Sequence, residues 1–417
     1  MQPYRAIELK YDILIIGAGP AGLTFARALA GSGLSIALVE QQAESALADP
    51  ADDGREIALT HRSHRLMREY GLWDRIADTD IGTLRDARVI DGDDADGLLF
   101  SHAEAGQPQL GWLVSNHAIR RAAWQAVRES GEVDIVAGAR VAGVHADAGG
   151  GEVRLADGRV LRGQLLIAAD SRFSESRRAL GIRADLHDFG RTMLVVRMRH
   201  EAPHEATAWE WFRYGQTLAL LPLDDANTSS AVLTATRAEI DALLALDEDA
   251  FGAAMSARFD RRLGAMKRVG PAVAYPLVGV YPERFHAERF ACIGDAAVGM
   301  HPVTAHGFNF GLLSVESLSK RILDALAHGE PIYAEKLLAD YDIEHRAATR
   351  PLYLATKLVA TLYTDDRAPA RAARKLALGA ARMGKPFRRL VMHGLTQPGE
   401  GMPFERARKL AMRLRPR

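Results

Sequence analysis

Hydrophobic residues at the start of the chain occur first as a short continuous run and then at helical spacing. Residues 12–16 form an apolar run rich in β-branched side chains, which is typical of a buried parallel strand. Residues 23–31 place alanine and leucine at helical spacing, and residues 35–39 form a second apolar run. The pattern therefore predicts a strand, a helix and a second parallel strand within the first forty residues.

A glycine-rich turn, Gly17-Ala-Gly-Pro-Ala-Gly22, joins the first predicted strand to the helix. Gly17 permits a tight turn, Gly19 lets the backbone approach a pyrophosphate, and Gly22 lets helix and strand pack closely. Pro20 and Ala21 begin the helix, where unpaired N–H groups and the positive end of the helix dipole attract phosphate. The turn therefore predicts a site for a dinucleotide, either NAD or FAD.

Acidic residues follow three of the predicted strands. Glu40 closes the second strand, 18 residues beyond Gly22, where it can accept hydrogen bonds from the adenosine ribose. Asp170 ends the apolar run 165–170, and Asp295 follows the run 289–293. Each aspartate alone suits a turn or a helix cap equally well. Together, and before the glycine-marked helix start at 307–309, they favour a flavin nucleotide, because such an aspartate can hold a ribityl hydroxyl.

The middle of the chain has the alternation of a β-sheet. Residues 140–161 predict strands joined by a turn at Asp157-Gly158, and residues 190–280 predict a sheet that covers a substrate, followed by helices from Ala238 and Asp247. Two aromatic residues of this sheet, Trp211 and Phe212, are candidate substrate contacts. Because neighbouring residues of a strand face opposite ways, part of this aromatic cluster at most lines a pocket. The alternative is ordinary sheet core.

Composition narrows the class of protein. The 417 residues include 53 Lys+Arg and 53 Asp+Glu, so net charge gives no basis for nucleic-acid binding. Cys292 is the single cysteine, which argues against disulfides and cysteine metal clusters. We find no secretory signal and no apolar run long enough to span a membrane, and expect a cytoplasmic protein with no metal.

Charge is lopsided at the end of the chain. Residues 350–417 contain 16 Lys+Arg against four acidic residues, a net charge of +12 in a neutral protein. Basic amphipathic helices are typical of surfaces that bind anionic membranes or acidic partners. The alternative is a solvated helix face.

The glycine turn, the Asp170 strand end and the Gly294-Asp295 segment together resemble the class A FAD-dependent aromatic hydroxylases, and more closely their ubiquinone-biosynthesis branch. The resemblance extends over roughly residues 10–395 and implies an α/β fold of the para-hydroxybenzoate-hydroxylase type. It implies a Rossmann-like FAD-binding domain with a parallel sheet, an interleaved β-sheet substrate domain and a helical C-terminal region. We expect the FAD-binding domain to span 10–180 and 285–330. The substrate domain should span 185–284 with contributions from 80–115, and the helical C-terminal region 331–417.

The resemblance also implies roles for individual residues. Ser174 and Arg177 complete the motif that begins at Asp170. The cofactor-binding residues that it implies are Gly17, Gly19, Pro20, Ala21, Gly22, Glu40, Arg55, Asn116, Arg120, Asp170, Asp295, Pro302, Gly307, Phe308 and Asn309.

This chain departs from the family pattern at two motifs. Ser171 follows Asp170 where glycine is usual, so that turn must accommodate a Cβ. His306 stands where the family has glutamine. We interpret it either as an acid/base partner of a phenolic substrate or as a neutral hydrogen-bonding replacement for that glutamine.

The chemistry that the resemblance implies is aromatic hydroxylation. NAD(P)H reduces FAD without a second nucleotide-binding domain, O₂ forms a flavin C4a-hydroperoxide, and its distal oxygen passes to the ring of a prenylated phenol or quinol of the ubiquinone pathway. Neither a protein nucleophile nor a metal is required. Two alternatives remain. One is another flavin enzyme of this fold, such as an isoprenoid reductase, a halogenase or a small phenolic acid hydroxylase, although the tryptophan-rich pattern of halogenases is absent. The other is a non-catalytic FAD-binding subunit of a biosynthetic complex.

Overall fold

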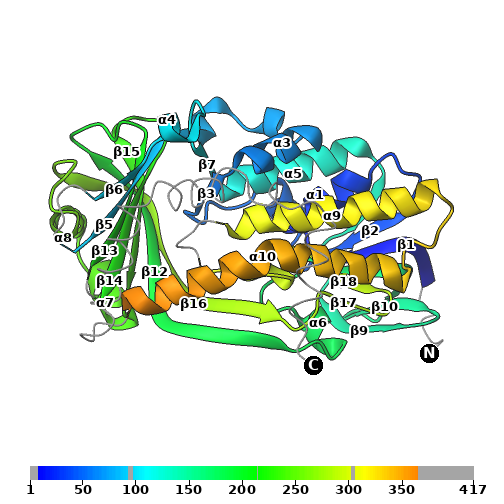
Figure 1. The fold of residues 1–417 in the computed structure, drawn as a ribbon. Coiled ribbons are helices and arrows are strands. Elements are labelled where there is room, and N and C mark those ends of the chain that lie inside the picture. Colours follow the sequence, from blue (N-terminus) through cyan, green and yellow to red (C-terminus); the bar gives the residue numbers. More distant parts are fainter. Residues whose placement is uncertain (1–7, 93–96, 214, 302–305, 365–417) are drawn as a thin grey trace, which may run out of the picture.

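The computed structural model describes residues 8–92, 97–213, 215–301 and 306–364. These residues form two lobes, each built on its own large β-sheet (Figure 1). The long strands β12 (Ala184–His200) and β16 (Met266–Pro282) run from one lobe to the other. Helix α10 (Glu335–Thr364) lies alongside them (Figure 1).

The first lobe contains a sheet with parallel central strands. Its order is β17-β18-β11-β1-β2-β8, and the antiparallel pair β9–β10 is attached to β11. The strands are β1 (Glu8–Ile16), β2 (Ile36–Val39), β8 (Val133–Val136), β9 (Val141–Asp147), β10 (Gly150–Leu155), β11 (Val160–Ala168), β17 (His286–Ala287) and β18 (Phe290–Cys292). Because β18, β11, β1 and β2 are parallel neighbours, the loops after them meet at one edge of the sheet.

The apolar runs of the sequence form the centre of this sheet. Ile13 pairs with Ile36 on one side and with Leu165 on the other, and its exposed fraction is 0%. The helix predicted after the glycine turn is α1 (Pro20–Leu29). The predicted strand, helix and second strand are thus confirmed, and so is the alternation of residues 140–161.

Helices cover this sheet and hold its edge in place. Helix α1 packs against both α5 (Asn116–Ser130) and α9 (Gly307–Ala327). A small sheet of β3 (Glu56–Leu59), β7 (Gly111–Ser115) and β4 (Ile81–Leu84) lies beside them. The shorter helices here are α2 (Glu44–Ala48), α3 (His61–Glu69), α6 (Glu175–Ala179) and the 3₁₀ turns η1 (Trp73–Arg75), η2 (Asp78–Asp80) and η3 (Gly294–Ala296).

The second lobe is a sheet with the order β16-β12-β15-β14-β13-β5-β6. Its remaining strands are β5 (Asp86–Asp91), β6 (Leu98–Phe100), β13 (Thr207–Arg213), β14 (Gln216–Pro222) and β15 (Thr228–Ala235), with α4 (His102–Ala105) after β6. The two helices that the sequence predicts after the sheet are α7 (Arg237–Leu244) and α8 (Glu248–Arg258), and they cover one of its faces. Thr236 caps α7 and Asp247 caps α8, which explains where both begin.

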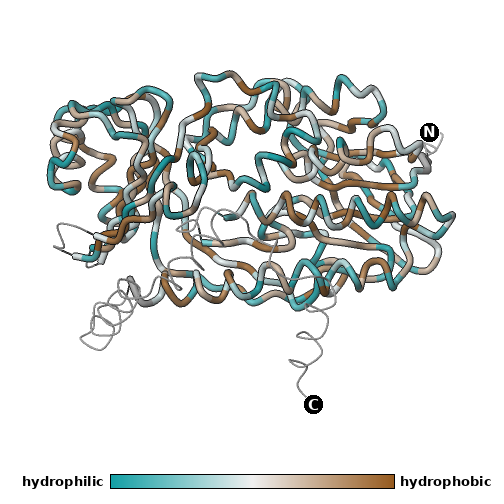
Figure 2. The backbone as a smooth tube through the Cα atoms, turned by 45° about the horizontal axis from the view of Figure 1, so that its top comes forward, coloured by the Kyte–Doolittle hydropathy of each residue, from teal (hydrophilic) through white to brown (hydrophobic). Residues whose placement is uncertain are grey.

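Hydrophobic residues run along the strands inside each lobe, and hydrophilic residues gather in the peripheral loops (Figure 2). Helix α10 is anchored to the first lobe by Tyr341, whose hydroxyl donates to the carbonyl of Cys292 over 2.6 Å. Of the helices described, α10 included, none is both long and apolar enough to cross a membrane. Most of the basic segment 350–417 lies outside the described residues.

Candidate active site

One cavity of about 550 Å³ extends from the glycine turn of the first lobe to the face of the second-lobe sheet opposite α7 and α8. Residues that the sequence predicts to bind the cofactor form part of its wall. Those that line it are Gly19, Pro20, Ala21, Arg55, Asn116, Asp170, Asp295, Gly307 and Phe308. The fold thus brings together segments that are up to about three hundred residues apart in the sequence.

The three glycines of the turn have different surroundings. Gly17 has φ of +106°, and a Cβ there would lie 2.5 Å from the carbonyl oxygen of Ala169. A Cβ on Gly22 would lie 2.0 Å from the carbonyl oxygen of Gly17, so a side chain would force strand and helix apart. A Cβ on Gly19 would meet nothing within 4 Å. Gly19 therefore leaves room beside the N-terminus of α1, where a pyrophosphate is stabilised by free N–H groups.

Glu40 lies behind this turn rather than in the cavity wall. One carboxylate oxygen accepts from the N–H of Ala18 over 2.8 Å, and the other accepts from the N–H of Gln42 over 2.9 Å. Arg120 donates to the side-chain oxygen of Gln42 over 3.0 Å. Each carboxylate oxygen keeps a second lone pair, so Glu40 can still accept a ribose hydroxyl as the sequence predicts.

Arg55 belongs to a tethered cluster at the junction of the lobes. Its Nη2 lies 2.5 Å from Oδ2 of Asp53, and Asn116 donates to the same oxygen over 2.7 Å. Tyr275 donates its hydroxyl proton to the backbone carbonyl of Asp53, and its ring lies 5.6 Å from the Arg55 guanidinium carbon. Burial opposes ionisation of Asp53, but the hydrogen bond and charge of Arg55 lower its pKa below the usual value. Arg55 is thereby held as a fixed cation facing the cavity.

The segment after β11 forms a second part of the wall. Oδ2 of Asp170 accepts from the N–H of Ser176 over 3.2 Å, whereas Oδ1 is buried without a hydrogen-bond partner among the described residues. Ser174 caps α6, and Arg177 donates to the carbonyl of Ala296 over 3.0 Å, which ties this motif to the one around Asp295. Ser171 has φ of +158°, a backbone conformation that glycine adopts with less strain.

Asp295 lies in the 3₁₀ turn that follows β18. Arg172 donates to its Oδ2 over 3.1 Å and also to the carbonyl of Val278 over 3.2 Å. The Asp295 side chain is 40% exposed, so it is accessible to a ligand in the cavity. Gly294 has φ of +58°, and a Cβ there would lie 2.7 Å from the Cβ of Ala21. Gly294 therefore permits this turn to approach the start of α1.

The predicted cofactor-binding residues at the start of α9 do not all face the cavity. Gly307 and Phe308 line the cavity. Asn309 instead accepts from the N–H of Thr60 over 3.1 Å and donates to the carbonyl of Ala58, so its side chain positions β3. His306 is the buried N-cap residue of α9, with its ring 5.9 Å from that of Phe310. The predicted Pro302 lies outside the described residues.

His301, for which the sequence predicts only a structural role, lines the cavity. Its ring makes an edge contact with Phe189, with 4.6 Å between centroids. Burial, together with the nearby Arg172 charge, lowers the pKa of His301 to about 4, so the ring is neutral at physiological pH. Its position next to the predicted Pro302 could have drawn attention to His301, but the sequence does not show that its ring is buried.

The sheet of the second lobe has two buried faces, and only one of them meets the cavity. Trp211 faces away from it: the indole is 2% exposed within the core under α7 and α8, and its Nε1 donates to the carbonyl of Gly92 over 2.8 Å. The prediction that Trp211 contacts substrate is thereby corrected, because its side of β13 is filled by helices. Phe212 points the other way and is 7% exposed, but it is not among the residues that line the cavity.

The cavity-facing side of this sheet is mostly apolar. Its lining residues are Met193, Val195, Glu210, Thr217, Ala219, Leu221, Val232, Thr234 and Tyr275. Glu210 and Tyr275 were not singled out in the sequence, although a glutamate inside an aromatic strand is an unusual residue that could have drawn notice. This wall suits a hydrophobic molecule with a few polar groups.

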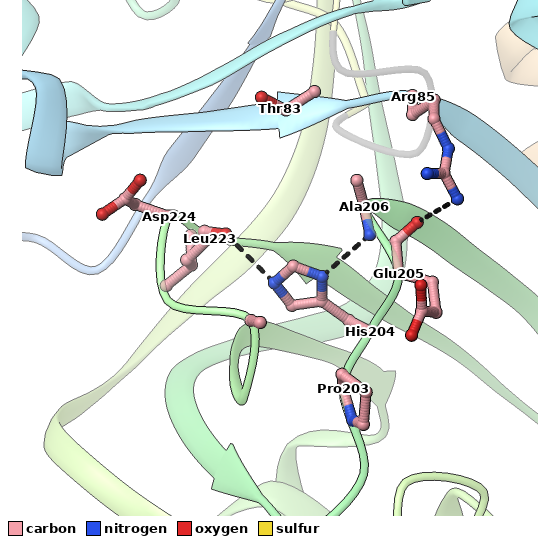
Figure 3. Close-up of a pocket in the computed structure, with 9 residues that line it drawn as sticks. Thr83, Arg85, Pro203, His204, Glu205, Ala206, Leu223 and Asp224 are labelled. Atoms are coloured by element: carbon pink, nitrogen blue, oxygen red, sulfur yellow. Dashed lines mark hydrogen bonds between the residues drawn. The ribbon is translucent and has the colours of Figure 1, made fainter.

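A second depression, of about 340 Å³, lies between β4, the loop that precedes β13 and the loop that joins β14 to β15 (Figure 3). His204 is fixed there, because its Nδ1 accepts from the N–H of Ala206 over 3.0 Å and its Nε2 donates to the carbonyl of Leu223. Arg85 donates to the carbonyl of Glu205 (Figure 3). His204 and Arg85 thus already form hydrogen bonds with backbone groups. This depression lies apart from the predicted site.

Comparisons with known proteins agree with this geometry. The model of the FAD binding domain family matches residues 10–353. The chain is 45% identical over 94% of its length to a ubiquinone hydroxylase, UbiM, of Neisseria meningitidis, and covers 85% of that protein. It is 34% identical over 91% of its length to the ubiquinone hydroxylase UbiL of Rhodospirillum rubrum, covering 88% of it. The structure of Klebsiella pneumoniae HpxO complexed with FAD superposes with a TM-score of 0.72 at 21% identity, over 94% of this chain and 99% of that one.

Proposed function

The chain belongs to the FAD binding domain family and is an FAD-dependent monooxygenase, and from this premise we propose that it hydroxylates the ring of a prenylated phenol or quinol of ubiquinone biosynthesis. One observation carries the proposal: a single cavity joins the glycine turn to the apolar face of a sheet. A dinucleotide fits the first end and a hydrophobic ring fits the second.

The residues of the first end suit FAD. Open space at Gly19 admits a pyrophosphate, and the unpartnered Oδ1 of Asp170 and the accessible carboxylate of Asp295 can accept hydroxyl groups of the cofactor. When bound, FAD accepts a hydride from NAD(P)H and, with O₂, supplies an electrophilic oxygen atom. The chain's own contribution is to hold the cofactor, exclude water through the apolar wall and orient the aromatic ring.

The proposed reaction is tested with the purified holoenzyme, NAD(P)H, isotopically labelled O₂ and a prenylated phenol. Mass spectrometry should find one labelled oxygen atom in the product. Reduction of a prenyl double bond without oxygen would indicate an isoprenoid reductase. Faster hydroxylation of an unprenylated phenolic acid would indicate a hydroxylase of small phenolic acids. Flavin that is never reduced would indicate a non-catalytic subunit.

Glu40 is expected to fix the adenosine half of the cofactor. The purified protein should be yellow and retain FAD rather than FMN, and Glu40→Ala should weaken FAD binding by about 1 to 3 kcal/mol through loss of a charge-assisted hydrogen bond. This corresponds to roughly 5- to 150-fold in Kd, measured by titrating the apoprotein. The matched control is Glu44→Ala, because the Glu44 side chain is 55% exposed and pairs with Arg128 at 3.5 Å. If Glu40→Ala binds FAD as tightly as wild type, Glu40 only caps the end of its strand.

The basic C-terminal segment is proposed to bring the enzyme to anionic membranes, where a polyprenylated substrate resides. Leu354 and Leu358, one turn apart near the end of α10, lie in the described part of this segment and are 51% and 60% exposed. Each lysine or arginine near a charged bilayer contributes about 1 kcal/mol, screened by salt.

Co-sedimentation with liposomes measures this contact. Binding should require acidic lipid and fall as salt rises to physiological concentration. It should also weaken, at constant FAD content, when basic residues outside the described range are neutralised together: Arg371, Arg374, Lys375, Arg388 and Arg389. If the wild-type protein does not bind acidic vesicles, these charges form a solvated helix face and the membrane proposal is wrong.

A further inference from the structure

Glu210 lies in the middle of β13, between two tryptophans that face the other way. Trp209 and Trp211 point toward Arg262, whose guanidinium carbon lies 5.3 Å and 4.7 Å from their ring centroids. Strand alternation turns Glu210 to the opposite side, and it lines the cavity that contains the glycine turn. The sequence around it is that of a buried strand, so a carboxyl group at this position is not explained by solubility.

The neighbours of Glu210 across the sheet are apolar. It pairs with Val89 on β5 and with Ala219 on β14, and the same row continues through Val232 and Val195. Among the described residues, its carboxyl group has no hydrogen bond or ion pair. Burial alone raises the pKa of Glu210 to about 8. Glu210 is half-buried and faces the cavity, so its carboxyl group is accessible to a ligand there, and an accessible carboxyl group among apolar neighbours marks the position as functional.

We propose that Glu210 binds the ring hydroxyl of the aromatic substrate and accepts its proton before the ring is hydroxylated. The inference rests on the proposed function, because it assigns to one residue the polar contact of that substrate. The rest of this wall, apart from the hydroxyls of Thr217, Thr234 and Tyr275, can contact the ring and the prenyl chain only through apolar groups.

The step is an ordinary proton transfer. The phenolic O–H bond breaks, its electron pair stays on oxygen, and the proton passes to a carboxylate oxygen of Glu210. The phenolate is more electron-rich at its ortho and para carbons, so it attacks an electrophilic oxygen atom faster than the phenol does. After attack, the ring carbon loses its proton to solvent and the oxygen regains the proton from Glu210, so the catalyst is restored.

The surroundings of Glu210 make it a suitable base. A phenol has a pKa of about 10, so a carboxyl group of ordinary pKa would be too weak a base. The raised pKa of Glu210 narrows the difference between the pKa values of base and phenol. His301 remains a weaker base, since its pKa is lowered to about 4. None of the other titratable groups that line the cavity shifts the pKa of Glu210; they are Arg55, Glu56, Asp170, Arg172, Tyr275, Asp295 and His301.

The test compares Glu210→Gln and Glu210→Leu with the wild-type holoenzyme, using ortho-prenylphenol and its methyl ether. The control, Glu205→Gln, makes the same chemical change at an exposed glutamate two residues before β13. At equal FAD content, Glu210→Gln should lower hydroxylation of the phenol by about 10²- to 10⁴-fold, and the wild-type rise in rate toward pH 8 should disappear. Wild type should bind the phenol more tightly than the ether, and Glu210→Leu should bind both alike.

Stability measurements separate a substrate contact from a structural role. Glu210→Leu should unfold at the same temperature as wild type or higher, because it replaces an unpartnered carboxyl group with an apolar side chain. A lowered unfolding temperature together with unchanged ether discrimination would make Glu210 structural and overturn the proposal.

The outcomes also distinguish this proposal from the proposed function. If wild type hydroxylates the phenol and the Gln variant does so equally fast with the same pH profile, the role of Glu210 is wrong and the function stands. If wild type hydroxylates no prenylated phenol, yet its preference for phenol over ether depends on Glu210, the function is wrong and the contact stands. If neither activity nor discrimination depends on Glu210, its assignment falls.

Discussion

Asp295→Ala is expected to yield a colourless protein that neither retains FAD nor hydroxylates, while its fold survives. The carboxylate lies at the edge of the first-lobe sheet, faces the cavity and is 40% exposed. Its ion pair with Arg172 is partly exposed, and such pairs contribute about 0 to 1 kcal/mol to stability. Its contact with the cofactor is charge-assisted, so its loss is felt chiefly in binding.

Absorbance of the bound flavin and thermal unfolding of the apoproteins measure the two effects separately. Asp241→Ala is the matched control, because Asp241 is also a half-exposed aspartate paired with an arginine, here Arg237 at 2.8 Å on α7. That variant should keep its flavin. Full flavin content and activity in Asp295→Ala would withdraw the assignment of this residue to the cofactor site.

Trp211→Ala is expected to destabilise the second lobe by about 3 to 5 kcal/mol, the usual cost of removing a large buried aromatic side chain. The indole is 2% exposed, donates a hydrogen bond to the carbonyl of Gly92 and lies against the guanidinium groups of Arg213 and Arg262. Urea unfolding followed by tryptophan fluorescence and circular dichroism should show an earlier transition.

Leu246→Ala, at a side chain that is 40% exposed in the same lobe, is the control and should change stability by no more than about 0.5 kcal/mol. A substrate contact would behave differently from a core residue. If Trp211→Ala unfolds like wild type but binds the aromatic ligand more weakly, the indole faces the cavity and the orientation of β13 described here is wrong.

The sequence by itself determined the parts of the site that are contiguous. The glycine turn predicts its strand and helix because a Cβ on Gly22 would collide with the carbonyl oxygen of Gly17 within the same short unit; the collision at Gly17, with Ala169 of the neighbouring strand, is visible only in the structure. Asp170 and Asp295 could be assigned to one region because parallel neighbouring strands end at the same edge of a sheet. These inferences need only local geometry and strand direction.

The tertiary structure decided which side chains face the cavity. Alternation along β13 separates Trp211 from Glu210 but does not say which side meets substrate, since helices bury one face and the first lobe covers the other. The same holds for Asn309, which contacts β3, and for Arg172, which pairs with Asp295. Such contacts join segments more than one hundred residues apart, and only the tertiary packing of the first lobe fixes them.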